Sequence, residues 1–95
     1  MDIRRIKALH KQTPEQSLDL HGLTAAEAEA VLDDFLRRQR AEGRRHVEVI
    51  HGKGAHGAGV LRLKTREWLA QSGAVLGYEE ARRNSGAVRV LLRRA

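Results

Sequence analysis

The sequence predicts an α/β fold, a two-layer α/β sandwich in which a mixed four-stranded sheet packs against two helices. The chain has 95 residues, the length of one domain. Its apolar residues take strand spacing and helical spacing in turn, in the order strand–helix–strand–helix–strand–strand. Hydrophobic residues make up 41% of the chain, which is enough to form the core of such a domain.

Residues 1–16 are expected to form a basic N-terminal arm, and residues 17–95 are expected to form the folded domain. Apolar residues of the arm have the spacing of one side of a short helix. Pro14 and its polar neighbours would end such a helix, because proline has no backbone N–H group to donate. The arm is therefore treated separately from the elements that follow.

A short strand and a long helix are predicted between residues 17 and 43. Leu18 and Leu20 alternate with polar residues, as in a strand. Thr24 is a typical N-cap residue, and Glu27 completes a capping box three residues later. Apolar residues then recur at helical spacing as far as Gly43, which is typical of the position just after a helix.

Three strands and a second helix are predicted in the rest of the chain. Residues 47–50 alternate as a strand and lead into a segment, 51–59, that is too rich in glycine for a packed element. A helix is expected over residues 60–71 and a strand over residues 75–81. In the last strand, residues 88–92, Val88, Val90 and Leu92 alternate with Arg89, Leu91 and Arg93.

The expected core contains the inward-facing apolar residue of each element. Phe35 is expected to be one of its largest members. His10 and His46 have no evident partner in the sequence and are expected at the surface. The predicted core residues are Leu18, Leu20, Val31, Leu32, Phe35, Val47, Val49, Leu61, Trp68, Leu69, Val75, Val88 and Val90.

The first two strands are expected to be parallel, because a helix connects them and such crossovers return in the same direction. Their carboxyl ends then lie at the same edge of the sheet, where ligands bind in open α/β sheets. The first strand ends in the residues Asp19 to Gly22, and the second is followed by His51 to Gly54. Polar residues are thus concentrated where this topology predicts a binding site.

The charge distribution favours a nucleic-acid partner. Residues 1–50 hold as many acidic as basic residues, so the net charge of +6 lies in residues 51–95. Arginine predominates, and its planar guanidinium suits bidentate phosphate contacts. An anionic membrane is a poorer alternative, because no basic amphipathic helix is evident. A merely soluble arginine-rich surface also remains open.

Composition excludes several classes of protein. No apolar run is long enough to span a membrane, and the N-terminus lacks the apolar stretch of a secretory signal. Cysteine is absent, which excludes disulfides and thiolate chemistry and makes the cytoplasm the expected location. Three aromatic residues are too few for a base-stacking platform.

Asp19 and His21 are candidate catalytic residues. They are two residues apart on a strand, so both side chains lie on one face. A carboxylate at this spacing can orient an imidazole, and histidine is the side chain best suited to proton transfer at neutral pH. The alternative is a polar strand end that faces water.

The sequence H-G-K-G is a candidate phosphate-binding loop. Gly52 and Gly54 allow close backbone approach, so that N–H groups can bind an anion, and Lys53 adds a positive charge. The spacing of a P-loop is missing, which argues against a nucleoside triphosphatase. A flexible loop with an exposed lysine is the alternative. Asp19, His21 and His51 form too small a ligand set to indicate a metal site, and no cofactor is expected.

These motifs in combination resemble the Smr (small MutS-related) domain. The matching sequences are LDLHG at residues 18–22, a T-x-x-E-A pattern at the first helix and VIHGKG at residues 49–54. The segment GVLRLKTREWL is similar to the family's helix after the loop. The resemblance runs from about Ser17 to Arg93.

The resemblance implies an α/β sandwich with endonuclease or nicking activity on DNA or RNA. It implies that Asp19 and His21 carry out catalysis, and it assigns nucleic-acid binding to the loop residues His51, Gly52, Lys53 and Gly54. Two departures affect this reading. The stretch after H-G-K-G is longer than in the most compact members, and the family's glycine-rich segment before the last strand is reduced to residues 84–87.

The leading interpretation is an endonuclease, and the alternative is a nucleic-acid-binding module without catalysis. Arg62 and Arg66 of the second helix are expected to contact phosphate beside the loop. His21 and His51, at neighbouring strand ends, are expected to share the roles of general base and general acid. RNA cleavage is expected to need no metal, whereas DNA nicking is expected to be slower or to need a divalent ion. Protein partners are unknown from the sequence.

Overall fold

The computed structural model describes residues 4, 8–52, 58–82 and 84–95. The predicted order of elements and the mixed four-stranded sheet with two helices are confirmed. A short 3-10 helix, η1 (Leu9–Lys11), comes before the first strand. The remaining elements are β1 (Gln16–Asp19), α2 (Ala25–Ala41), β2 (His46–Ile50), α3 (Ala58–Gln71), β3 (Val75–Glu80) and β4 (Ala87–Leu92).

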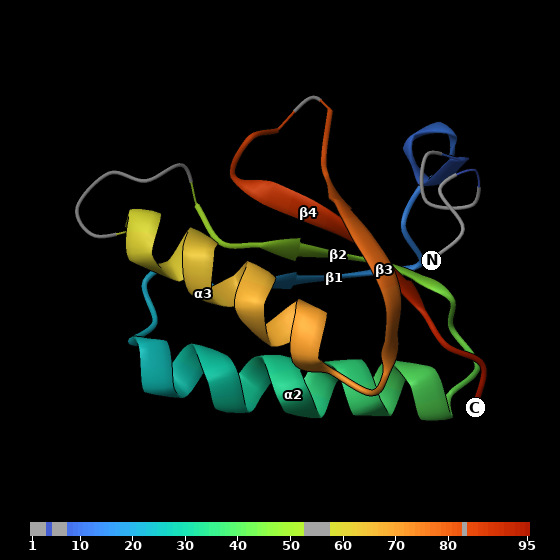
Figure 1. The fold of residues 1–95 in the computed structure, drawn as a ribbon, viewed down its shortest axis with the longest axis horizontal. Coiled ribbons are helices and arrows are strands. Elements are labelled where there is room, and N and C mark those ends of the chain that lie inside the picture. The colour runs from blue at the N-terminus through green and yellow to red at the C-terminus, as the bar shows by residue number, and fades with distance from the viewer. Residues whose placement is uncertain (1–3, 5–7, 53–57, 83) are drawn as a thin grey trace.

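The sheet has the strand order β1-β2-β4-β3. β1 pairs with β2 in parallel, as predicted, and β4 runs antiparallel to both β2 and β3. The strands β1, β2 and β3 therefore point in one direction and end at the same edge of the sheet. Both helices lie on one face of this sheet (Figure 1).

One row of residues crosses the sheet at this edge. Asp19 is opposite Ile50, and Ile50 is opposite Ala87. The N–H group of Ala81 continues the row by donating a 3.0 Å hydrogen bond to the carbonyl of Ala87. This row shows that the carboxyl ends of β1, β2 and β3 lie at one edge of the sheet. We refer to this edge as the site edge.

Helix α2 begins and ends as its sequence predicts. The backbone N–H of Glu27 donates to Thr24 Oγ1 at 3.2 Å, and the N–H of Thr24 donates to Glu27 Oε1 at 2.9 Å. Gly43, after the last turn, has a φ of +85°, which a residue with a Cβ atom rarely adopts. This well-defined helix carries the chain from the end of β1 back to the start of β2.

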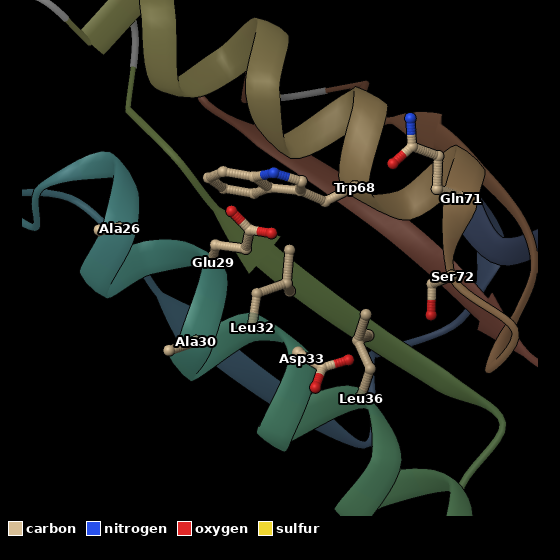
Figure 2. A pocket seen from close by; sticks show the side chains of 9 residues that line it. All are labelled: Ala26, Glu29, Ala30, Leu32, Asp33, Leu36, Trp68, Gln71 and Ser72. Atoms are coloured by element: carbon tan, nitrogen blue, oxygen red, sulfur yellow. The ribbon is translucent and has the colours of Figure 1, made fainter.

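Most of the predicted core is buried between the sheet and the helices. Leu18, Phe35 and Trp68 are only half-buried and lie at the margin of this core. The indole of Trp68 lies over α2 (Figure 2), beside a groove of about 490 Å³ between the two helices. The prediction for Val31 is wrong, because its residue is 40% exposed. The buried residues of α2 are Ala28, Leu32, Leu36 and Gln39, and Val31 lies beside this buried face.

The second face of the sheet is partly covered by the N-terminal segment. Leu9 is buried against Leu91, and Leu76 packs beside them. Arg89 of β4 donates to the carbonyls of Leu9 and Gln12, at 3.3 and 2.9 Å. These contacts attach η1 to the sheet, and so they extend the packed structure into the expected arm.

The expectation that His46 lies at the surface is wrong. It is 3% exposed, and its Nε2 lies 3.2 Å from Nη1 of Arg89. Arg89 also donates from Nε to Glu48 at 3.0 Å. His46 begins β2, next to the β4 strand that η1 covers, and this covering could not be inferred from strand periodicity.

Candidate functional site

The candidate site is built from the ends of β1 and β2 at the site edge. Asp19 is the last residue of β1, and His21 lies two residues later in a turn. His51 follows the last residue of β2 directly. The parallel pairing of β1 with β2 brings these ends together, as the sequence predicts.

The turn after β1 holds His21 at the surface. Its backbone is closed by a 3.2 Å hydrogen bond from the N–H of Leu23 to the carbonyl of Leu20. Gly22, within this turn, has a φ of +84°, so that glycine is favoured there over any residue with a Cβ atom. Leu20 is fully buried and anchors the turn in the core.

Asp19 and His21 form an exposed pair. Asp19 Oδ1 accepts a 2.9 Å hydrogen bond from the backbone N–H of His21 and lies 3.5 Å from Nδ1 of its ring. The side chains are 76% exposed for His21 and 56% exposed for Asp19. The carboxylate therefore orients the Nδ1 side of the imidazole and leaves Nε2 accessible for proton exchange with a ligand.

His51 is in the opposite environment. It is 0% exposed, and its Nδ1 lies 2.7 Å from the carbonyl oxygen of Gly52. A carbonyl only accepts hydrogen bonds, so Nδ1 carries the proton and Nε2 is the unprotonated nitrogen of the neutral ring. Nε2 is buried and has no hydrogen-bond partner within the described residues.

The pKa of His51 is lowered, chiefly because burial disfavours the charged imidazolium. The positive charges of Arg62 and Arg66 lower it further, while the hydrogen bond to Gly52 and the negative charge of Glu80 act in the opposite direction. His51 is therefore neutral at physiological pH.

The backbone at the start of the H-G-K-G sequence is tied to the chain that precedes β4. The N–H groups of His51 and Gly52 both donate to the carbonyl of Gly86, at 2.8 and 3.0 Å. Gly52 has a φ of +94°, so glycine is needed where the chain leaves the sheet. The predicted phosphate-binding residues Lys53 and Gly54 lie outside the described residues.

Arg62 and Arg66 lie one helical turn apart on α3 and both face Glu80, the last residue of β3. Their Nη2 atoms are 3.3 and 3.4 Å from the two carboxylate oxygens of Glu80. All three side chains are between 35 and 40% exposed. The two predicted phosphate-binding arginines are therefore partly accessible at the site edge.

The predicted site residues form two groups, one on each side of the sheet. Leu18 and Leu20 pack in the helix layer, so Asp19 between them points to the opposite face. Val49 also packs in the helix layer, and alternation returns His51 to that side, within the electrostatic influence of the α3 arginines. The two groups can meet a shared ligand only at the end of the sheet.

Glu80 was not singled out from the sequence. The available signal was topological, because the third strand runs parallel to the first two and its carboxyl end reaches the same edge. Within the described ranges, no cluster of three or more His, Asp or Glu side chains is placed to hold a metal ion. None of the described helices is long and apolar enough to cross a membrane.

Comparison with known proteins places these features in a family. The Smr domain model matches residues 18–93. The chain is 35% identical over 94 residues to a protein of Treponema pallidum, and 36% identical over 80 residues to the ribosome rescue factor SmrB of Yersinia pseudotuberculosis. These matches cover 94% and 84% of this chain but 46% and 44% of the relatives, so the chain spans less than half of their length.

Two crystal structures are similar in fold. The Smr domain of Thermus thermophilus MutS2 superposes with a TM-score of 0.76 and 36% identity, over 82% of this chain and 98% of that domain. YdaL, a stand-alone small MutS-related protein from Escherichia coli, superposes with a TM-score of 0.88 and 29% identity, over 99% of this chain and 78% of YdaL.

Proposed function

This chain belongs to the Smr domain family, and on that premise we propose that it is an endonuclease that cleaves phosphodiester bonds in RNA. The observation that carries the proposal is the exposed Asp19–His21 pair at the edge where the parallel strands end. An accessible imidazole with a carboxylate against one of its nitrogens is suited to general acid–base catalysis.

RNA is favoured over DNA by the composition of the site. Hydrolysis of DNA requires an activated water, which metal ions usually supply when several carboxylates hold them. Asp19 supplies one carboxylate at the end of β1, and the described residues contain no cluster of three or more His, Asp or Glu side chains that could hold a metal ion. RNA carries its own nucleophile, since its 2′-hydroxyl can attack the adjacent phosphorus once a base removes the proton. The new bond from the 2′-oxygen to phosphorus forms as the bond to the 5′-oxygen breaks, and the 5′-oxygen takes a proton from the protonated base or from water. The products are then a 2′,3′-cyclic phosphate and a 5′-hydroxyl.

We assign proton transfer to His21 through Nε2, with Asp19 as a positioning residue that orients the ring. The predicted sharing of acid and base roles with His51 finds less support, because His51 is buried and its pKa is lowered. We assign His51 instead to holding Gly52 at the start of the loop through Nδ1.

Phosphate binding at the cleaved bond is assigned to the backbone of Gly54 and the side chain of Lys53, and the α3 arginines bind phosphate further along the strand. The predicted part of Gly52 finds less support, because its N–H already donates to the carbonyl of Gly86. Preorganised positive groups stabilise the charge that develops on the transferring phosphoryl group. The net charge of +6, which lies in residues 51–95, supports this assignment. The name of the SmrB relatives, ribosome rescue factor, also supports RNA as the substrate and the cytoplasm as the location.

The test is incubation of the wild-type chain and the His21→Ala variant with end-labelled RNA and DNA, with and without a chelator. We expect RNA cleavage that persists in the chelator, leaves cyclic phosphate ends and is abolished in the variant. Loss of RNA cleavage in the chelator would instead support a metal-dependent nickase. Full activity of the variant would remove His21 from the mechanism.

A second function, nucleic-acid binding without cleavage, is favoured by the basic half of the chain alone. Under this function the wild-type chain and the His21→Ala variant both bind RNA with a steep salt dependence, because each neutralised phosphate releases counterions. Neither protein produces new RNA ends. The same experiment therefore separates the two functions.

A further inference from the structure

A second concave site lies at the far end of the site edge, beside β3. It has a volume of about 680 Å³, and its lining includes Arg66 of α3, Glu80 at the end of β3, and Arg82 and Ser85 of the β3–β4 connection. We call this hollow the β3 pocket. The proposed function uses Arg66 of this lining, but neither the cleavage step nor the sequence motifs account for Arg82, Ser85 or the hollow itself.

The β3 pocket is continuous with the candidate site through the backbone. Ser85 lines the pocket, and the next residue, Gly86, accepts the hydrogen bonds from His51 and Gly52. The charges of Arg66 and Glu80, which also line it, influence the pKa of His51. A ligand lying along the site edge therefore passes from the end of β2, at His51 and Gly52, toward this pocket.

The charges at the β3 pocket suit an anion when both of its carboxylates are counted. Glu79 lines the pocket beside Glu80, and Arg62, Arg66 and Arg82 outnumber these two carboxylates by one. Glu80 is one carboxylate placed between two guanidinium groups, so the cluster with Arg62 and Arg66 keeps one net positive charge. The separations of 3.3 and 3.4 Å exceed the 2.7–2.9 Å that is usual for charge-assisted hydrogen bonds. Each guanidinium has five N–H donors, so both arginines keep donors for a ligand. Arg82 is exposed at the rim and adds a further cation.

We propose that the β3 pocket is a second phosphate subsite, which binds the backbone of the substrate strand at a distance from the cleaved bond. The proposal rests on the proposed function, because it assumes that a strand lies along the site edge. Three strand spacings separate β1 from β3, or roughly 14 Å. At about 3.4 Å per stacked nucleotide, this is about four nucleotides from the His21 end.

Glu80 acts in this subsite as an internal competitor for the arginines. Without a strand it holds Arg62 and Arg66 over the end of β3. A bound phosphate then takes some of their donors, and the long contacts to Glu80 are the ones that can be exchanged. Removing this carboxylate charge leaves more positive charge for the strand to neutralise.

The test uses 2′-O-methyl oligoribonucleotides of increasing length, which cannot be cleaved by attack of a 2′-hydroxyl. Dissociation constants are measured by fluorescence anisotropy for the full chain, for Arg82→Ala and for the control Arg93→Ala. Arg93 is also exposed, but it follows β4 at the opposite edge of the sheet. Both variants therefore lose one surface arginine.

In the wild-type chain we expect affinity to rise about tenfold when the oligonucleotide becomes long enough to reach the pocket, as for one charge-assisted contact. Arg82→Ala should lose this increment and keep the affinity for shorter oligonucleotides, while Arg93→Ala should keep both. An equal loss at every length, or an unchanged increment in Arg82→Ala, would overturn the subsite.

A second measurement compares Glu80→Gln with Glu67→Gln. Glu67 is exposed on α3, so both variants gain the same net charge. Glu80→Gln should steepen the salt dependence of binding by about one further counterion, and only for the longer oligonucleotides. Identical salt dependence in the two variants would overturn the role of Glu80.

The two proposals fail separately. If longer oligonucleotides bind more tightly through Arg82 but the protein does not cleave RNA, the subsite is supported and the endonuclease is rejected. If cleavage depends on His21 but affinity does not rise with oligonucleotide length, the endonuclease is supported and the subsite is rejected.

Discussion

The ends of β1 and β2 carry the same polar side chain in two different environments. His21, after β1, is 76% exposed and lies beside a carboxylate. His51, after β2, is 0% exposed and donates to a backbone carbonyl. The two residues lie at one edge of one sheet, so lying at that edge does not by itself determine what each can do. Burial determines it.

The difference arises from the place of each strand in the sheet. β1 is an edge strand, and the chain turns at residues 21–22 after a last hydrogen bond to β2, from the N–H of Leu20 to the carbonyl of Ile50. β2 lies between β1 and β4, and the chain after it continues to pair, through the carbonyl of Gly86. The inner position therefore buries His51, and the outer position leaves His21 in solvent.

The largest expected effect concerns the exposed histidine. His21→Ala should reduce RNA cleavage by about 10²- to 10⁴-fold, because a general acid–base group is lost. Its free energy of unfolding should change by less than about 0.5 kcal/mol, since the side chain is exposed. Cleavage rates and urea unfolding measure the two effects. The control is Ser17→Ala, an exposed change on β1 that should leave both values unaltered.

The reverse pattern is expected for the buried histidine. His51→Ala should lower the free energy of unfolding by about 2 kcal/mol, because it leaves a cavity beside the core and frees the Gly52 carbonyl. Cleavage should fall less than in His21→Ala when both are measured well below the melting temperature. A catalytic loss as deep as that of His21→Ala, with unaltered stability, would show that His51 takes part in the chemistry.

A smaller effect is expected when the partner of His21 loses its charge. Asp19→Asn keeps an oxygen that can accept from the backbone N–H of His21 but removes the carboxylate. The difference between charged and neutral acceptors, about 1 kcal/mol, corresponds to a reduction in kcat of about fivefold. RNA affinity should stay the same. Asp34→Asn on α2 removes an equal charge and should leave kcat unaltered.

The smallest expected effect is the pH dependence that His51 contributes to stability. Its pKa is lowered in the folded state, so below about pH 6.5 the unfolded chain binds a proton that the folded chain does not. The contribution of neutral His51 to the free energy of unfolding is complete above that pH. It decreases as the pH falls toward the lowered pKa. Urea unfolding between about pH 7 and pH 5 should show a steeper loss in the wild type than in His51→Asn.

Glu15 provides a separate pH window against which this result can be checked. The backbone N–H groups of Arg45 and His46 donate to its Oε1 at 2.8 and 2.9 Å, and they lower its pKa. The stability that it contributes is therefore present above about pH 4.5 and is lost below it. If the His51 variant differed from the wild type only in this acidic window, the assignment to His51 would be wrong.

The fold could be predicted because its signals are local. Thr24, Glu27 and Gly43 mark the limits of α2 through hydrogen bonds and backbone angles that involve neighbouring residues. The helical connection between β1 and β2 then makes these strands parallel. The candidate site could be placed at their ends for the same reason, and the Asp19–His21 contact follows from their spacing on one strand.

What could not be predicted depends on residues that are far apart in the chain. The burial of His46 and Leu91 depends on η1, which reaches β4 across about 80 residues of sequence. The environment of His51 depends on Gly86 and on charges from α3 and β3. Spacing within one element contains no information about such neighbours, so the exposed histidine was the better predicted of the two.

The strand order also has a consequence for the synthesis of the protein. β4 lies between β2 and β3, although it is the last of the described strands in the chain. A chain that is still growing can pair β1 with β2 and cap α2, but β3 then has no neighbour to bind. The sheet, and with it the site edge, can be completed only after residues 87–92 have left the ribosome. The domain therefore becomes able to bind a substrate in one late step.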